Sequence, residues 1–368
     1  MATRTMLSAS GVSQEARPVR VLVVDDSAYM RFTLTKYLNE ASGFVVVGAA
    51  RDGRDALDMI PKVKPDVVTL DVEMPRLDGL STLREIMAVC PMPVVMLSSL
   101  TAEGARETVQ ALTLGAVDFV LKPPAKANVA MVMNEVIAKV RAAATAKVMP
   151  PIAPRQFHQP TPAVYVSSKP TRALRRGDKV VVVGASTGGP RALNTVVAAL
   201  APRLEAAFLI VQHMPVGFTR SLAERLDHIS PLAIKEAEPG DAIEVGRGLL
   251  APGGFHMMVN DHDRIELNQN PTVHGVRPAI DVTMASVAAR YKEASVGVVL
   301  TGMGRDGTNG SVLIHAAGGR VIAEDEETCV VWGMPRSVAE AGVANTIAKL
   351  PDVAGEIEKA VKTMNNEQ

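Results

Sequence analysis

Cysteine, excess charge of one sign and long apolar runs are all scarce in this sequence of 368 residues. The two cysteines, Cys90 and Cys329, lack the spacing of metal ligands and do not suggest a disulfide framework. Lysine plus arginine and aspartate plus glutamate both total 39, so the basic excess that a nucleic-acid partner would require is absent. Because no apolar run approaches the length of a bilayer span, we expect no membrane insertion.

The N-terminal residues 1–18 lack the continuous apolar stretch of a secretory signal. We expect them to form a disordered lead, with a transit peptide as the alternative. Since the sequence has so few cysteines, we expect a cytoplasmic protein. It also has no short internal repeat, which excludes a solenoid.

Short β-branched runs alternate with helix-type stretches from Val21 onward, and the alternation gives five strand–helix units. Strands this uniformly apolar predict a parallel sheet with helices on both faces. A proline-rich segment, 146–178, then predicts a linker between a first domain, 19–145, and a second domain, 179–366. The fold class we expect is therefore α/β, with two doubly wound parallel-sheet domains.

The second domain shows strand-type runs at 180–183, 207–214, 248–259, 296–302 and 319–324. Helix-type stretches separate them, and a hairpin-like insertion is expected around Asn260 to Asn270. Ligand sites of such sheets lie beyond the carboxyl ends of the strands. Residues that directly follow the predicted strands are therefore the candidates for chemistry.

Five polar residues follow successive strands of the first domain. A single aspartate at such a position usually caps the next helix, but five converging groups indicate a site. Clustered carboxylates repel one another unless a cation such as Mg²⁺ lies among them, and an adjacent lysine would help to neutralise a transferred phosphoryl group. The five residues are Asp25, Asp26, Asp71, Ser98 and Lys122.

The segments VLVVDDSAYMR, DVVTLDVEMPRLDG, PVVMLSS and FVLKPP resemble the receiver domain of two-component response regulators. The resemblance implies that Asp71 accepts a phosphoryl group and that Asp25, Asp26 and Asp71 hold Mg²⁺. It further implies that Ser98 and Lys122 contact the phosphoryl group. Phe119 stands at the position of the aromatic switch residue.

The second domain opens with VVVVGASTGGPRA, a strand that leads through a glycine turn into a helix. A dinucleotide fingerprint is not met, because Ser186 stands where the middle glycine should be and the next strand ends in Gln212 and His213 rather than an acid. A P-loop is not met either, since no Lys-Ser or Lys-Thr follows the glycines. The turn does match G-x-S-x-G, which presents a serine nucleophile.

A base and an acid for Ser186 follow two other predicted strands, at His213 and Asp306. Taken singly, a histidine is usually structural and an Asp-Gly pair is usually a turn, but the three strand ends together indicate a nucleophile, a base and an acid. Their order, Ser, His, Asp, differs from that of α/β-hydrolases. His256 and His274 are weaker base candidates, and no histidine spacing suggests zinc.

The segments GASTGGP, IVQHM and LTGMGRDG behind a receiver and a linker closely resemble the chemotaxis response regulator protein-glutamate methylesterases. The resemblance implies Ser186 as nucleophile, His213 as general base and Asp306 as the orienting acid, with Thr187 and Met303 in the oxyanion site and pocket wall. It implies hydrolysis of glutamyl methyl esters on chemoreceptors, deamidation of receptor glutamines, and phosphorylation by a chemotaxis histidine kinase. Mg²⁺ is implied for the receiver and no cofactor for the esterase step.

Two alternative functions compete with this interpretation. A DNA-binding output domain, the commonest partner of a receiver, would be short, helical and basic, whereas this half is large, α/β and nearly neutral. A phosphorylation-controlled binding module without hydrolase activity is the other alternative. The presence of all three candidate catalytic residues argues against it.

Overall fold

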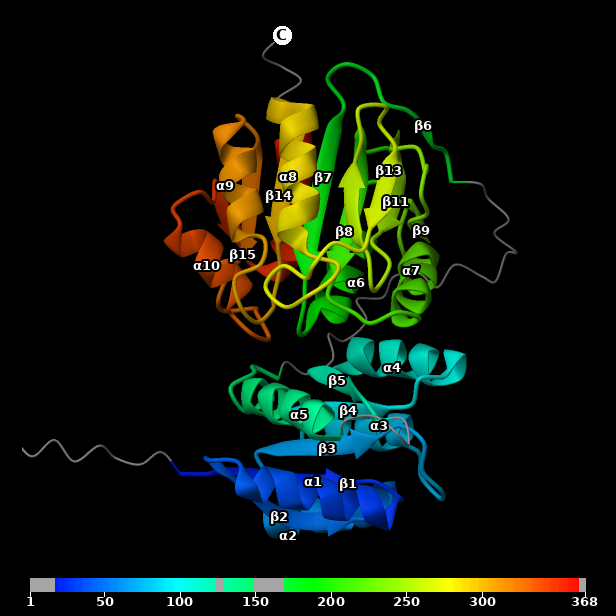
Figure 1. The fold of residues 1–368 in the computed structure, drawn as a ribbon, viewed down its shortest axis with the longest axis vertical. Coiled ribbons are helices and arrows are strands. Elements are labelled where there is room, and N and C mark those ends of the chain that lie inside the picture. The colour runs from blue at the N-terminus through cyan, green and yellow to red at the C-terminus, as the bar shows by residue number, and fades with distance from the viewer. Residues whose placement is uncertain (1–16, 124–128, 149–168, 364–368) are drawn as a thin grey trace, which may run out of the picture.

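The structure is a computed structural model that describes residues 17–123, 129–148 and 169–363. Residues 1–16 of the expected disordered N-terminal segment lie outside the described residues. Residues 149–168 of the expected linker lie outside them as well. Figure 1 shows two sheet-and-helix units stacked along the long axis, with the N-terminal unit at the bottom. In the described part of the chain, no helix is long and apolar enough to cross a membrane.

The N-terminal unit is a parallel sheet of five strands in the order β2-β1-β3-β4-β5. This is one of the common doubly wound orders. Its strands are β1 (Val19–Val24), β2 (Phe44–Ala50), β3 (Val67–Asp71), β4 (Val94–Ser98) and β5 (Asp118–Leu121). Its helices are α1 (Ala28–Glu40), α2 (Gly53–Val63), α3 (Gly79–Val89), α4 (Ala102–Leu114) and α5 (Val129–Ala144).

Alternate residues of β1 show how both faces of this sheet are covered. Leu22 and Val24 belong to the hydrophobic cluster under α2, α3 and α4, whereas Val21 and Val23 belong to the cluster under α1 and α5. All four are fully buried. Since side chains of a strand alternate between the two faces, the unbroken apolar run VLVV requires helices on both sides.

The C-terminal unit is built on a parallel sheet of seven strands in the order β16-β15-β14-β7-β8-β11-β9. The strands are β7 (Lys179–Ala185), β8 (Ala206–Gln212), β9 (Ala233–Glu236), β11 (Arg247–Leu250), β14 (Ser295–Val299), β15 (Arg320–Glu324) and β16 (Thr346–Ala348). The helices are α6 (Gly189–Ala199), α7 (Phe218–Ile229), α8 (Ile280–Tyr291), η1 (Lys292–Ala294), α9 (Thr308–Ala316), α10 (Met334–Glu340) and α11 (Leu350–Thr363). The doubly wound fold class is confirmed for both units.

One expected strand divides into two. The run 248–259 holds β11 and, after a turn at Pro252–Gly254, β12 (His256–Val259). Strand β12 pairs with β13 (Ile265–Asn268) in an antiparallel hairpin outside the main sheet, in the region where an insertion was expected. Proline and two glycines interrupt the run, because proline cannot donate to a ladder and glycine weakens a strand. The short strands β9 and β16 were not expected, and neither was the small sheet of β6 (Arg172–Ala173) and β10 (Glu244–Val245).

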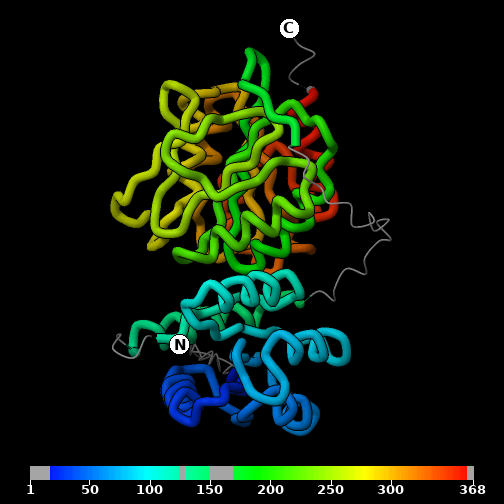
Figure 2. The backbone as a smooth tube through the Cα atoms, turned by 90° about the vertical axis from the view of Figure 1, so that its right-hand side faces the viewer, coloured from blue at the N-terminus to red at the C-terminus, as the bar shows by residue number. Residues whose placement is uncertain are grey.

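Helix α4 of the N-terminal unit packs against α6 and α7 of the C-terminal unit. The ring of Phe119 stacks on that of Phe218 at the start of α7, with centroids 4.7 Å apart. A single hydrophobic cluster runs from the N-terminal core through α4 into the core under α6 and α7. Figure 2 shows the same close approach from the side. The two units therefore share a packed interface.

Candidate active site at the carboxyl edge of the second sheet

The turn that bears Ser186 lies between β7 and α6, where the strand order of the sheet reverses direction. Gly188 adopts φ +77° at the start of the helix, a conformation that favours glycine. At Gly189 a Cβ atom would lie 2.0 Å from Oε1 of Gln212, so a side chain at this position would displace the Gln212 amide. The glycines of the motif therefore allow a sharp turn that packs closely on the end of β8.

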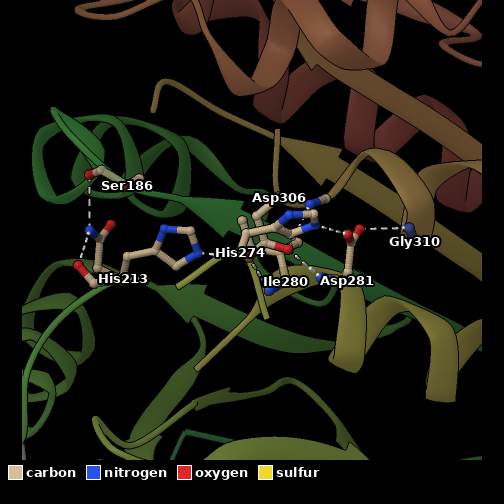
Figure 3. Close-up of polar contacts among 9 residues, drawn as sticks. Ser186, His213, His274, Ile280, Asp281, Asp306 and Gly310 are labelled. Carbon is tan, nitrogen blue, oxygen red and sulfur yellow. Dashed lines mark hydrogen bonds and ion pairs between the residues drawn. The ribbon is translucent and has the colours of Figure 1, made fainter. Parts of the chain in front are cut away.

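His213 and Asp306 meet at the same edge of the sheet. His213 follows β8, and Asp306 lies in the loop between β14 and α9. Nε2 of His213 is 2.8 Å from Oδ2 of Asp306, and both side chains are largely buried. The base and acid expected from the sequence are thus joined by a hydrogen bond (Figure 3).

The carboxylate of Asp306 is fixed by three backbone N–H groups as well. Oδ2 accepts from Ile280 N at 2.7 Å, and Oδ1 accepts from Asp281 N and Gly307 N at 3.0 Å each. Two of these donors belong to the first turn of α8, where the helix dipole favours a negative charge. The first turn of this helix therefore fixes the orientation of the acid.

Burial acts to raise the pKa of Asp306. The hydrogen bond from His213, the positive charge that its imidazole carries when protonated, and the N–H groups of Asp281 and Ile280 nevertheless hold that pKa below its usual value. An ionised carboxylate only accepts hydrogen bonds, so Nε2 of His213 carries the proton in this pair. The lone pair of the neutral imidazole is then on Nδ1. That nitrogen is the one available to a nucleophile.

Ser186 is half-buried, and in the described part of the chain no hydrogen bond joins its Oγ to His213. Its backbone is held at two points, since its N–H donates to Thr301 O at 3.0 Å and its carbonyl accepts from Gln212 Nε2 at 2.9 Å. Gln212 also donates to His213 O at 3.2 Å. Gln212 thereby connects the turn of Ser186 to the residue that carries the base.

A second histidine–carboxylate pair adjoins the first. Nε2 of His274 lies 2.9 Å from Oδ2 of Asp281, whose Oδ1 accepts from Gly310 N at 2.7 Å (Figure 3). His256, in contrast, is buried in β12 with Nε2 against Pro271 O. The sequence reasoning missed Asp281. The sequence feature that could have indicated Asp281 is an aspartate in the first turn of a helix that begins shortly after an Arg-Pro pair.

The N-terminal unit contacts the serine turn directly. Oγ1 of Thr187 donates to Oδ2 of Asp118 at 2.5 Å, and Gly188 N donates to Val117 O at 3.1 Å. Two hydrogen-bond donors beside Ser186 are therefore occupied by Asp118, the first residue of β5, and by Val117, which directly precedes it. Met303, the other expected pocket residue, is 41% exposed in the loop after β14.

The acidic cluster of the N-terminal unit forms at the carboxyl edge of its sheet, as expected. Ligand oxygens of Asp25, Asp26 and Asp71 lie within 4.8 Å of one another. Nζ of Lys122 is 3.0 Å from Asp25 and 2.6 Å from Asp71. Three carboxylates this close repel one another, and their oxygens are the ligands that Mg²⁺ prefers, so the residues fit such an ion.

Burial raises the pKa of Asp71 to about 6, although Lys122 acts in the opposite direction. Burial acts to lower the pKa of Lys122, but the carboxylates of Asp71 and Asp25 raise it above its usual value. Ser98 is fully buried, and its Oγ accepts from Thr108 Oγ1 at 2.7 Å. Of the expected phosphoryl contacts, Lys122 touches Asp71 here, whereas the Ser98 hydroxyl is engaged with α4.

A receiver-type sheet with an acidic pocket, packed on an α/β unit with a serine turn and a histidine–aspartate pair, is the organisation of a receiver-coupled serine hydrolase. Comparison with known families supports this class. Residues 21–134 match the response regulator receiver domain, and residues 181–357 match the CheB methylesterase domain. The chain belongs to the protein-glutamate methylesterase/protein-glutamine glutaminase family.

Relatives of that name extend over nearly the whole chain. The protein from Symbiobacterium thermophilum is 51% identical over 355 residues, which cover 94% of this chain and 98% of the relative. The protein from Pyrococcus abyssi is 43% identical over 354 residues, which cover 94% of this chain and 94% of the relative. Among solved structures, the Thermotoga maritima CheB methylesterase catalytic domain is 43% identical, with a TM-score of 0.48, and covers 49% of this chain and 97% of that one.

Proposed function

We propose that this protein is a phosphorylation-controlled esterase that hydrolyses glutamyl methyl esters on chemoreceptors and deamidates receptor glutamines. The observation that supports it most strongly is the His213–Asp306 hydrogen bond of 2.8 Å at the sheet edge that also bears the Ser186 turn. Family membership supports the choice of substrate, because the relatives are named for both reactions. The resemblance to these enzymes implies a substrate on the cytoplasmic helices of chemoreceptors, so we propose that the protein acts in the cytoplasm.

In this mechanism Oγ of Ser186 attacks the ester carbonyl while Nδ1 of His213 removes its proton. Asp306 keeps the proton of His213 on Nε2 and stabilises the imidazolium that forms. Collapse of the tetrahedral intermediate breaks the bond to the methoxy group, which takes the proton from His213 and leaves as methanol. Water, deprotonated by His213, then hydrolyses the glutamyl-serine ester and restores both glutamate and Ser186.

The developing oxyanion needs donors aimed at it. We assign this role to the start of α6, where backbone N–H groups and the positive end of the helix dipole lie beside Ser186. The Thr187 hydroxyl and the Gly188 N–H are the donors that Asp118 and Val117 occupy in this structure. The receiver thus competes with the oxyanion for the same groups.

Deamidation follows the same path with ammonia as the leaving group. The attacking serine, the base and the oxyanion donors are unchanged, and His213 again gives the proton to the departing group. Since an amide is the poorer acyl donor, we expect this reaction to be slower than ester hydrolysis.

Phosphorylation of Asp71 by a chemotaxis histidine kinase is the proposed activating signal. Asp25, Asp26 and Asp71 would hold Mg²⁺, which neutralises charge on the transferred phosphoryl group when it is bound. Lys122 lies 2.6 Å from Asp71 and is placed to contact the same group. We propose that phosphorylation shifts the population toward an arrangement in which Asp118 and Val117 leave the serine turn.

Release of labelled methanol from methylated chemoreceptor membranes tests the proposed activity. Ser186→Ala removes the nucleophile and is expected to abolish release. Ser337→Ala, a serine of α10 in the same unit, is the matched control and is expected to retain it. Undiminished release by Ser186→Ala would exclude the serine mechanism, and no release by the wild-type protein would favour a binding module without hydrolase activity.

A further inference from the structure

Glu324 is a buried carboxyl group near the serine turn that the proposed chemistry does not use. It is the last residue of β15 and only 1% exposed. A buried carboxyl group without hydrogen-bond partners is strongly destabilising. Hydrogen-bond partners for both oxygens of Glu324 are therefore expected around it.

Both oxygens of Glu324 are engaged. Oε2 accepts the backbone N–H of Thr301 at 2.8 Å, and Oε1 lies 3.1 Å from Oγ1 of Thr328. Thr328 in turn accepts from Leu350 N at 3.0 Å. The carboxyl group is thus held between the loop after β14 and the loop after β15.

Thr301 is hydrogen-bonded to two residues of the serine turn. Its carbonyl accepts the N–H of Ser186 at 3.0 Å, and its hydroxyl donates to the carbonyl of Thr187 at 3.0 Å. The same hydroxyl accepts from Val331 N at 3.0 Å. Ser186 and Thr187 are therefore both anchored to Thr301, and Thr301 is anchored to Glu324.

We propose that Glu324 is a positioning residue for the nucleophile, acting through Thr301 on the backbone of Ser186 and Thr187. This inference rests on the proposed esterase function and deepens it. Glu324 touches neither substrate nor base in this mechanism. Its contribution is to keep the turn in the geometry from which Ser186 attacks, where a displacement of about 1 Å can cost about 100-fold in rate.

The neutral form of the side chain suits this role. Burial raises the pKa of Glu324 to about 7, and the N–H of Thr301 acts in the opposite direction. The titratable groups around it are the adjacent Asp325, the thiol of Cys329 and the side chain of Arg191, which lines the same small cavity. A protonated Oε1 would donate to Thr328 while Oε2 still accepts from Thr301. A glutamine amide can make the same two contacts.

The test is the kcat and KM of methanol release from methylated chemoreceptor membranes, with phosphodonor and Mg²⁺ present. Glu324→Gln is expected to keep kcat within about threefold. Glu324→Leu, of similar size but without an acceptor for Thr301 N, is expected to lose about 100-fold in kcat with KM unchanged. Val180→Ala removes buried volume at the opposite end of β7 and controls for loss of stability alone.

Equal kcat values for Glu324→Leu and the wild type would overturn the inference while leaving the esterase function intact. Equal losses in Glu324→Leu and in a comparably destabilised Val180→Ala would overturn it as well. If Glu324→Leu does not fold, Glu324→Asp takes its place, because the shorter side chain withdraws the acceptor from Thr301. If the wild-type protein releases no methanol, the proposed function fails and the inference falls with it.

Discussion

Replacement of Asp306 by asparagine tests the geometry of the site, because the two side chains have the same shape and differ in one acceptor. Four donors surround the carboxylate, with His213 Nε2 and Ile280 N on Oδ2 and the N–H groups of Asp281 and Gly307 on Oδ1. An amide can accept on one side only. One pair of donors must therefore face an NH₂ group.

The free-energy cost of the substitution depends on which way the asparagine amide faces. An NH₂ group toward Asp281 and Gly307 leaves two buried N–H groups without an acceptor, at about 1–3 kcal/mol each. An NH₂ group toward His213 leaves only Ile280 N unpaired, but it requires Nε2 of His213 to become an acceptor. The second orientation is the less costly one. It moves the imidazole proton to Nδ1 and removes the base that Ser186 needs.

We expect Asp306→Asn to lower kcat for methanol release on the order of 10⁴-fold, the size of effect known for the acid-to-amide change in a serine protease triad. This corresponds to about 5 kcal/mol of transition-state stabilisation. Asp178→Asn, an ion-paired carboxylate that directly precedes β7 at the end far from the site and whose side chain is 7% exposed, is the matched control and should keep kcat within about twofold. Activity of Asp306→Asn within about tenfold of the wild type would refute the assignment of Asp306 as the orienting acid.

Three further predictions concern the receiver and the buried acid. Asp71→Asn should leave basal methanol release unchanged and remove its stimulation by a phosphodonor with Mg²⁺; stimulation of the wild-type size would contradict the switch. Asp118→Ala should raise release without phosphodonor about tenfold, because it removes the hydrogen bond to Thr187, and a hydrogen bond to a charged group contributes about 1.5–3 kcal/mol; a rate equal to wild type would show that this contact does not hold the site closed. Glu324→Gln should change the pH dependence of stability. Because the folded-state pKa of about 7 lies above the ordinary 4.5, the folded chain binds more protons, and stability falls as pH rises from about 4.5 through 7. The variant lacks this loss, so it should gain about 3 kcal/mol relative to wild type between pH 4 and pH 8 in urea unfolding; parallel stability curves would exclude a shifted carboxyl group.

The sequence was sufficient for the fold class, because both sheets are parallel and their buried strands are unbroken apolar runs. It also located the acidic pocket and the edge that bears the Ser186 turn, His213 and Asp306. These positions follow from one rule, that residues at the carboxyl ends of parallel strands meet at one edge. The domain boundaries and the catalytic roles of these residues stay predictions.

The hydrogen bonds that fix the side chains of the site could not be predicted from the order of strands and helices in the sequence. Which nitrogen of His213 faces Asp306 depends on how α8 presents Ile280 and Asp281, which lie 26 and 25 positions away from Asp306 along the chain. The hydrogen bond between Thr187 and Asp118 joins positions 69 residues apart in different units. Such pairings arise from tertiary packing, for which local periodicity carries no signal.

The organisation also explains why a receiver can control an esterase without entering its chemistry. Phe119, which the receiver resemblance assigns to the aromatic switch position, stacks on Phe218, while Val117 and Asp118 occupy donors of the serine turn. We propose that a change at the carboxyl edge of the receiver sheet frees these donors by moving Val117 and Asp118 away from the serine turn. The closed arrangement described here is the state in which we expect low activity.

A serine esterase that is governed by its own receiver should release methanol from methylated chemoreceptors at different rates before and after addition of a phosphodonor with Mg²⁺, and this pair of rates is the decisive measurement. We predict a marked increase for the wild-type protein, no increase for Asp71→Asn, and no release in either condition for Ser186→Ala. Equal rates for the wild type with and without phosphodonor, or release by Ser186→Ala, would contradict a serine esterase governed by its receiver.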